Sequence, residues 1–188
     1  MRSREWSKLY YLNPENILVG LRHISQTYNL NEMNLREATL RTKELKDFGE
    51  SRRCALFCYG MSQSLGIKIQ YAQSEKSDYD FIAFCETDCG NYFIPIQMKE
   101  LVPFNLNRKT SLQDEINKLK KYTDSKDLIV AFHINRVVDM VLSEIVIPPL
   151  AIGGIWLFGA SDLEQENWIV IGNIMKPDAK WYNFLYPR

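Results

Sequence analysis

Two short apolar segments on either side of a polar turn constrain the fold of this chain most. Residues 81–85 and most of 92–98 are apolar, and residues 86–91 between them are mainly polar. This pattern is typical of two antiparallel strands joined by a hairpin. Pro95 cannot donate a backbone hydrogen bond, so the second strand either starts after it or has an exposed side there.

A helical pattern precedes the hairpin. Residues 50–65 form this pattern, Gly66 stops it, and Gly49 separates it from a charged, helix-prone stretch at 35–48. Apolar side chains recur within it at the spacing of one buried helix face. The members of this face are Cys54, Cys58, Met61 and Leu65, and Glu50 falls on the same face.

Further strands and one more helix are expected. Residues 67–72 alternate between apolar and polar and suit a strand before the hairpin. Thr110 and Gln113 form a capping box that opens a second helix, with Leu112, Ile116 and Leu119 facing inward. The remaining apolar runs, at 128–132, 152–158 and 168–171, suit strands, and the last two form a hairpin around the loop 161–167.

The expected order is therefore helix, three strands, helix, strand and a C-terminal hairpin. This order predicts an α/β sandwich with a mixed central sheet flanked by helices. Because the sequence has no repeat, low-complexity tract or flexible linker, we expect one domain over residues 1–188. Its core spans about 36–135 and its C-terminal extension about 136–188.

Charge and hydropathy exclude several classes of protein. The 23 basic and 23 acidic residues cancel, so any nucleic-acid surface must be local. The first 25 residues contain no apolar run long enough for a signal peptide. The apolar stretch at 137–158 contains Asp139, Glu144 and two prolines, which indicates buried protein interior and not a membrane span. We therefore expect a cytoplasmic protein.

The four cysteines form two C-x-x-x-C pairs, Cys54 with Cys58 and Cys85 with Cys89. Neither pair has the C-x-x-C spacing of zinc or redox sites, so reduced structural thiols are expected, with a four-thiolate metal site as the alternative. The sequence also lacks a glycine-rich phosphate loop and any local motif for a serine or cysteine nucleophile.

Three polar residues fit this apolar frame least well. Asp80 precedes the strand at 81–85, and Gln97 and Lys99 end the next strand. Because side chains alternate along a strand, Gln97 and Lys99 share one face. Hairpin pairing would set Asp80 beside Gln97. A lysine and an aspartate at a partly buried corner must pair or bind a ligand, because an isolated charge there is costly.

The order of elements and these residues resemble the PD-(D/E)XK nuclease superfamily, which has the restriction-endonuclease-like fold. Asp80 matches the aspartate that starts the family's second strand, and Gln97-Met98-Lys99, 17 residues later, matches its (D/E)-x-K strand. Glu50 matches the glutamate often present on the preceding helix. Gln97 replaces the usual Asp or Glu, and Tyr79 stands where Pro is frequent.

The resemblance implies a Mg²⁺- or Mn²⁺-dependent nuclease that hydrolyses DNA or RNA. Asp80, Gln97 and Glu50 would hold the metal, together with the Met98 carbonyl, because Mg²⁺ prefers oxygen ligands. Lys99 would stabilise negative charge on the attacking water or the transition state.

Charge within segments agrees with a nuclease cleft. Residues 36–53 carry six basic and four acidic side chains, and residues 108–126 carry six and three, while residues 75–91 carry one and five. Two basic arms could thus flank an acidic sheet edge, although solvated lysine faces have the same composition. His133 could reach this edge and bind phosphate, or only end its strand.

Two alternatives to a nuclease remain. Asp80, Gln97 and Lys99 could pair with one another with no metal present. The chain could also be a catalytically inactive relative that acts as a binding or assembly module. In that case the aromatic C-terminal hairpin would mediate a homodimer or bind a protein partner, because aromatic residues are enriched at interface cores.

Overall fold

The computed structural model of the chain describes residues 2–27, 46–74 and 78–188. The predicted charged stretch at 35–48 lies largely outside these ranges, as does most of the first basic arm. The described helices and strands are, in chain order, α1 (Arg2–Trp6), α2 (Pro14–Thr27), α4 (Lys46–Leu65), β1 (Ile69–Gln73), β2 (Phe81–Thr87), β3 (Gly90–Leu101), α5 (Leu112–Asn117), the 3₁₀ helix η2 (Lys118–Lys121), β4 (Ser125–Ile134), the 3₁₀ helix η3 (Leu142–Glu144), β5 (Ile152–Ala160), β6 (Asn167–Gly172) and β7 (Lys180–Leu185).

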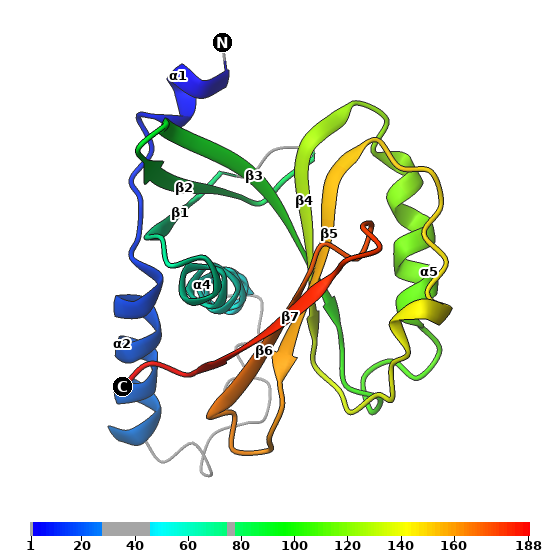
Figure 1. Cartoon of the computed structure of the whole chain (residues 1–188). Coiled ribbons are helices and arrows are strands. Elements are labelled where there is room, and N and C mark those ends of the chain that lie inside the picture. Colours follow the sequence, from blue (N-terminus) through cyan, green and yellow to red (C-terminus); the bar gives the residue numbers. More distant parts are fainter. Residues whose placement is uncertain (1, 28–45, 75–77) are drawn as a thin grey trace.

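All the described strands form a single seven-stranded sheet in chain order, β1 to β7. The pairs β1–β2, β2–β3, β5–β6 and β6–β7 are antiparallel, whereas β3–β4 and β4–β5 are parallel. Figure 1 shows that the sheet curls, with α4 on one side and α5 on the other. The predicted α/β class with a mixed sheet is confirmed.

The β2–β3 hairpin confirms the first expectation from the sequence. Phe81 lies opposite Ile96, and the ladder closes at Thr87 and Gly90. The strand does not start late, because Pro95 pairs with Ile82 inside it. Pairing of β3 with β4 begins only at Ile96, so the side of β3 toward β4 is unpaired at Pro95.

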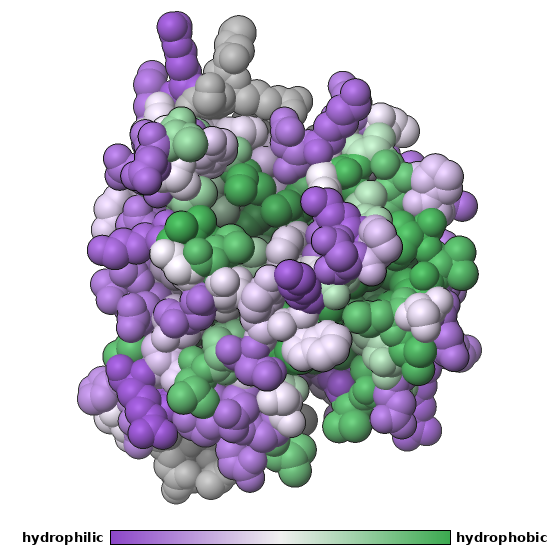
Figure 2. All heavy atoms as spheres, in the orientation of Figure 1, coloured by the Kyte–Doolittle hydropathy of each residue, from purple (hydrophilic) through white to green (hydrophobic). Residues whose placement is uncertain are grey.

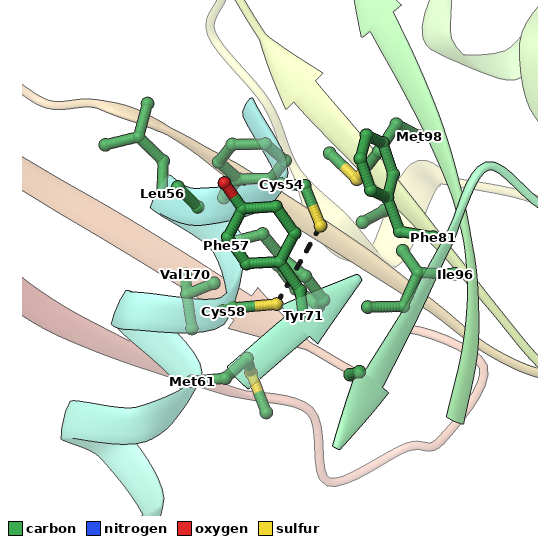
Figure 3. Packing of buried hydrophobic residues seen from close by; sticks show 14 of the residues in the cluster. Cys54, Leu56, Phe57, Cys58, Met61, Tyr71, Phe81, Ile96, Met98 and Val170 are labelled. Carbon is green, nitrogen blue, oxygen red and sulfur yellow. Dashed lines mark hydrogen bonds between the residues drawn. The ribbon is translucent and has the colours of Figure 1, made fainter. Parts of the chain in front are cut away.

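Helix α4 supplies the core on one face of the sheet. Cys54, Cys58 and Met61 are buried, and they pack with residues of β1, β2 and β3 (Figure 3). Two predictions were wrong in detail. Gly49 lies inside the helix and does not separate two segments, and Leu65 is 51% exposed at the C-terminal end, where Gly66 stops the helix in a left-handed conformation.

The opposite face is covered by α5 and by the segment between β4 and β5. Ile116 and Leu119 are buried against Val130 and Phe132 of β4. The capping box at the start of α5 is one residue later than predicted. Its members are Ser111 and Asp114, because the Asp114 carboxylate can reach back to the Ser111 backbone N–H.

The ends of the chain complete the sheet and its cover. The predicted C-terminal hairpin forms as β5 and β6, but it is continuous with the core because β5 pairs with β4, and β7 adds a strand that the sequence did not predict. The C-terminus lies beside α2 (Figure 1), where Tyr186 donates to the Leu18 carbonyl at 3.0 Å. None of the described helices is both long and apolar enough to cross a membrane.

Candidate functional site

The candidate site lies where β3 extends beyond β2. The ladder between these strands begins with Phe81 opposite Ile96, whereas β3 continues to Leu101 with β4 alone as its neighbour. The Asp80 N–H donates to the Ile96 carbonyl at 2.9 Å, which holds Asp80 at the open end of β2. The end of one strand thus places a carboxylate beside the polar part of the next.

Asp80 and Gln97 are brought together, as the register of the hairpin predicted. Oδ2 of Asp80 accepts a hydrogen bond from the Met98 N–H at 2.9 Å and a short one from Nε2 of Gln97. The same Nε2 lies 3.4 Å from the Met98 carbonyl oxygen. Two oxygen atoms, one charged and one from the backbone, therefore converge on one point, and the Gln97 amide nitrogen occupies it.

Tyr122, which the sequence analysis missed, fixes the other end of the amide. Its hydroxyl donates to Oε1 of Gln97 at 3.1 Å, and only 4% of the tyrosine is exposed. Burial raises the pKa of Tyr122 to about 12, and the charges of Asp80 and Asp78 add to this effect. The phenol is therefore a stable neutral donor at neutral pH.

Lys99 extends from the same face of β3 as Gln97, because the two residues are two positions apart. It is half-buried, and desolvation together with the nearby charge of Lys121 lowers the pKa of its ammonium group. Asp80, Glu115 and Glu50 oppose this effect. Lys99 thus lies in the electrostatic field of the site.

Glu50 approaches the site from α4 and not from the sheet. It is half-buried in the second turn of this helix, and its charge is one of the three that favour the ammonium form of Lys99. One turn later, Arg53 forms an ion pair with Glu100 of β3 at 3.5 Å. This pair ties α4 to β3 one turn after Glu50.

The donors present suit a hard divalent cation only after a change at Gln97. Asp80 and Glu50 provide carboxylates and Met98 a carbonyl, which are ligands that Mg²⁺ and Mn²⁺ accept. The Gln97 amide would have to turn so that its oxygen replaces its nitrogen, and Tyr122 permits this because a hydroxyl can also accept. In the part of the chain that the structure describes, no three His, Cys, Asp or Glu residues gather as a metal group.

The cysteines and His133 lie elsewhere. Cys54 and Cys58 are neighbours in the core with sulfur atoms 3.9 Å apart, whereas Cys85 is buried in β2 and Cys89 is exposed in the hairpin turn, and all four are free thiols. His133 is buried, and its ring stacks on Phe158. The imidazole faces the core on the α4 side, so of the two alternatives for His133 the structure agrees with a residue that only ends its strand.

Of the two predicted basic arms, the second is described and borders the site. Lys118 forms an ion pair with Glu115 at 2.6 Å. Nζ of Lys121 lies 5.0 Å from the centroid of the Tyr122 ring. The arm therefore contacts the residue that holds Gln97.

Comparison of the chain with protein-family models, curated proteins and solved structures found no match.

Proposed function

We propose that the protein is a metal-dependent nuclease of the restriction-endonuclease-like fold, which hydrolyses phosphodiester bonds in DNA or RNA in the cytoplasm. One observation carries this proposal: the oxygens of Asp80 and Met98 converge on one point at the open end of β2, and Lys99 lies on β3, one residue after Met98. The succession of α4, three strands with antiparallel neighbours, α5 and the parallel strand β4 supports it.

Each side chain has a distinct role in this proposal. Asp80 and Glu50 hold Mg²⁺ or Mn²⁺ with the Met98 carbonyl and the turned amide of Gln97. The cation, when bound, polarises the phosphate and lowers the pKa of a water molecule. Lys99 donates hydrogen bonds to the oxygen atoms that gain charge in the transition state, and its partial burial strengthens this interaction.

The test is hydrolysis of plasmid DNA and single-stranded RNA by the purified protein with Mg²⁺ or Mn²⁺. Lys99→Ala should lower the rate by about 100-fold or more, the range typical of a lost transition-state donor. Asp80→Ala should lower it at least as much, because it removes a proposed ligand of the cation. Lys120→Ala, a matched change of an exposed lysine, should retain the rate. Absence of cleavage by the unaltered protein, or equal rates in all variants, would contradict the proposal.

The cation itself provides a second measurement. We expect Mg²⁺ to bind weakly, with a dissociation constant on the order of millimolar, because the site offers only two carboxylates. Glu50→Gln removes one of the two anionic ligands and should weaken binding strongly in titration calorimetry. Full affinity in this variant would remove Glu50 from the metal site.

A catalytically inactive binding module is the second candidate, and the Gln97–Asp80 hydrogen bond favours it because Asp80 needs no cation to be satisfied. Figure 2 shows apolar side chains over the side where α5 and residues 135–151 lie. A shallow apolar groove there includes Met140, Leu142 and Trp181, which is 64% exposed. A second copy or a protein partner would bind this groove. Analytical ultracentrifugation of the unaltered chain and of Trp181→Ala tests whether the groove mediates self-association. A point substitution is used because removing the C-terminal part would delete strands of the sheet.

A further inference from the structure

Strand β7 is the last strand of the sheet (Figure 1), and among the described residues only β6 pairs with it. The other end of the sheet differs, because Leu12 pairs with Tyr71 at the outer edge of β1 and exchanges two backbone hydrogen bonds with it. An open strand edge offers N–H and C=O groups to another extended chain. The sheet can therefore be extended at β7.

The backbone groups that face this open edge follow from the pairing of β7 with β6. The Tyr186 N–H donates to the Glu166 carbonyl at 2.8 Å, which makes these two residues a hydrogen-bonded pair of the antiparallel ladder. Hydrogen-bonded and non-hydrogen-bonded pairs alternate along such a ladder. The N–H and C=O groups of Trp181, Asn183 and Leu185 therefore point away from β6.

The side chains of the same three residues are exposed. Trp181 and Leu185 are each 64% exposed, and Asn183 lies between them on the same face of the strand. Phe184 is buried on the other face, beside Tyr59 of α4. Trp181 also lines the apolar groove described above. Large apolar side chains beside an open strand edge favour association with another chain.

Two copies of β7 are complementary to each other in one antiparallel register. With a two-fold axis at Asn183, this residue lies opposite its own copy and Trp181 lies opposite Leu185, so all three outward-facing residues form hydrogen-bonded pairs. A shift of one residue would set outward-facing groups against groups that face β6, and a shift of two would leave one of the three residues unpaired. Beyond the strand ends, the same register sets the exposed Asp178 opposite the exposed Arg188 of the second copy, and these charges are opposite.

We propose that the protein forms a homodimer in which the β7 strands of two copies pair antiparallel about Asn183 and join two seven-stranded sheets into one. The main chain forms this interface, and Trp181 packs on Leu185 of the second copy at each end. The dimer does not depend on whether the chain cleaves nucleic acid. Because so short a ladder buries little surface, we expect a dissociation constant on the order of micromolar.

Sedimentation velocity of the full chain, over a concentration series that spans the micromolar range, tests the dimer. Asn183→Pro removes an outward N–H from each copy but no hydrogen bond to β6, so the sheet of the monomer is retained. The loss of two interface hydrogen bonds should raise the dissociation constant by about tenfold or more. Asn183→Ala keeps the N–H and is the matched control, with an expected change of less than about fivefold.

Two charged variants test the register without a proline. Asn183→Lys and Asn183→Asp each set two like charges against each other at the two-fold axis and should raise the dissociation constant by about tenfold. An equimolar mixture of the two variants should restore association, because an ammonium group then lies opposite a carboxylate. Gln63→Lys, at an exposed position of α4, is the control for the added charge.

Weak association of each charged variant alone, with recovery in the mixture, would support pairing about Asn183. A chain that is monomeric at every concentration would overturn the inference, as would a mixture that shows no recovery. A dimer that is weakened by Trp181→Ala but not by Asn183→Pro or the charged variants would also overturn it. That result would assign self-association to the apolar groove and not to the edge of β7.

Discussion

At the scale of single residues, the amide of Gln97 determines how charge is accommodated beside Asp80. The amide offers an N–H to the Asp80 carboxylate and a carbonyl to the Tyr122 hydroxyl, so both neighbours are satisfied without a cation. A glutamate at this position would set two carboxylates against each other, which is stable only with a shared proton or a bound cation. Gln97 therefore lets Asp80 be satisfied without a bound cation.

Gln97→Glu should make the protein dependent on a divalent cation. Without metal, the variant loses the hydrogen bond to Asp80 and gains a like-charge contact, at a cost of about 2 kcal/mol. For a chain of this length that corresponds to a melting temperature lower by about 4–8 °C in EDTA. Mn²⁺ should restore the loss and bind more tightly than to the unaltered chain. Gln63→Glu, on an exposed position of α4, serves as the control. Equal melting temperatures of Gln97→Glu with EDTA and with Mn²⁺ would contradict this account.

Asp80, Gln97 and Lys99 could be located from the sequence because the hairpin register and strand alternation depend on local pattern. Tyr122 and Lys121 could not, since they reach the site from a separate element whose approach depends on how α5 packs over β4. A buried tyrosine after a helix gives no spacing signal. The two alternatives for His133 could not be separated for the same reason, because the face of β4 that it occupies depends on tertiary packing.

At the scale of elements, the β2–β3 hairpin and α5 were predictable because each has its own turn or cap. The predictions missed α1, α2 and β7. Strand β7 carries Lys180 and Asn183 among aromatic residues, so its sequence has no clear strand pattern. It forms a strand because it pairs with β6, and local sequence does not specify this pairing. Gly49 was taken as a helix boundary, but tertiary packing of α4 outweighs the propensity of one glycine.

Strand β6 offers a test of close packing in the C-terminal part of the sheet. A Cβ atom added at Gly172 would lie 1.6 Å from the ring of Trp156 on β5. Gly172→Ala should therefore lower the free energy of unfolding by about 1–3 kcal/mol, as overpacking usually does. Gly20→Ala is the matched control, because nothing lies within 4 Å of its added Cβ in α2 and the alanine favours the helix. Urea denaturation measures the free energy of unfolding of both variants. Equal urea midpoints for Gly172→Ala and the unaltered chain would show that the Trp156 ring moves aside at no cost.

At the scale of the whole molecule, the sheet separates a core on the α4 side from a core on the α5 side. The candidate site lies at the open end of β2, next to both. Ile96 and Met98 point toward α4, whereas the residues between and after them, Gln97 and Lys99, point toward α5. Glu50 comes from the first side and Tyr122 from the second. Both layers must therefore assemble before Tyr122 binds Gln97 and the charge of Glu50 acts on Lys99.

The buried phenols of these two cores should make stability fall at alkaline pH. Burial raises the pKa of Tyr71 and of Tyr186, and it raises the pKa of Tyr11 to about 12. A raised tyrosine pKa means that the unfolded chain releases its proton first, at about pH 10. Stability is therefore fully present below that pH and is lost as pH rises toward the folded-state pKa. The raised pKa of Cys54 acts in the same direction from about pH 8.5, and the lowered pKa of Lys99 acts against it.

Urea unfolding between pH 7 and pH 11 measures this dependence. We expect the free energy of unfolding to be nearly constant to about pH 8.5 and then to fall, with each released proton adding about 1.4 kcal/mol per pH unit to the slope. Tyr71→Phe should flatten the fall above pH 10, although it also removes the 2.8 Å hydrogen bond to Ser51 and so lowers stability at pH 7. Tyr10→Phe alters a tyrosine that is 85% exposed and should leave the slope unchanged. A slope as steep in Tyr71→Phe as in Tyr10→Phe would mean that Tyr71 ionises equally in both states, contrary to its burial in the core.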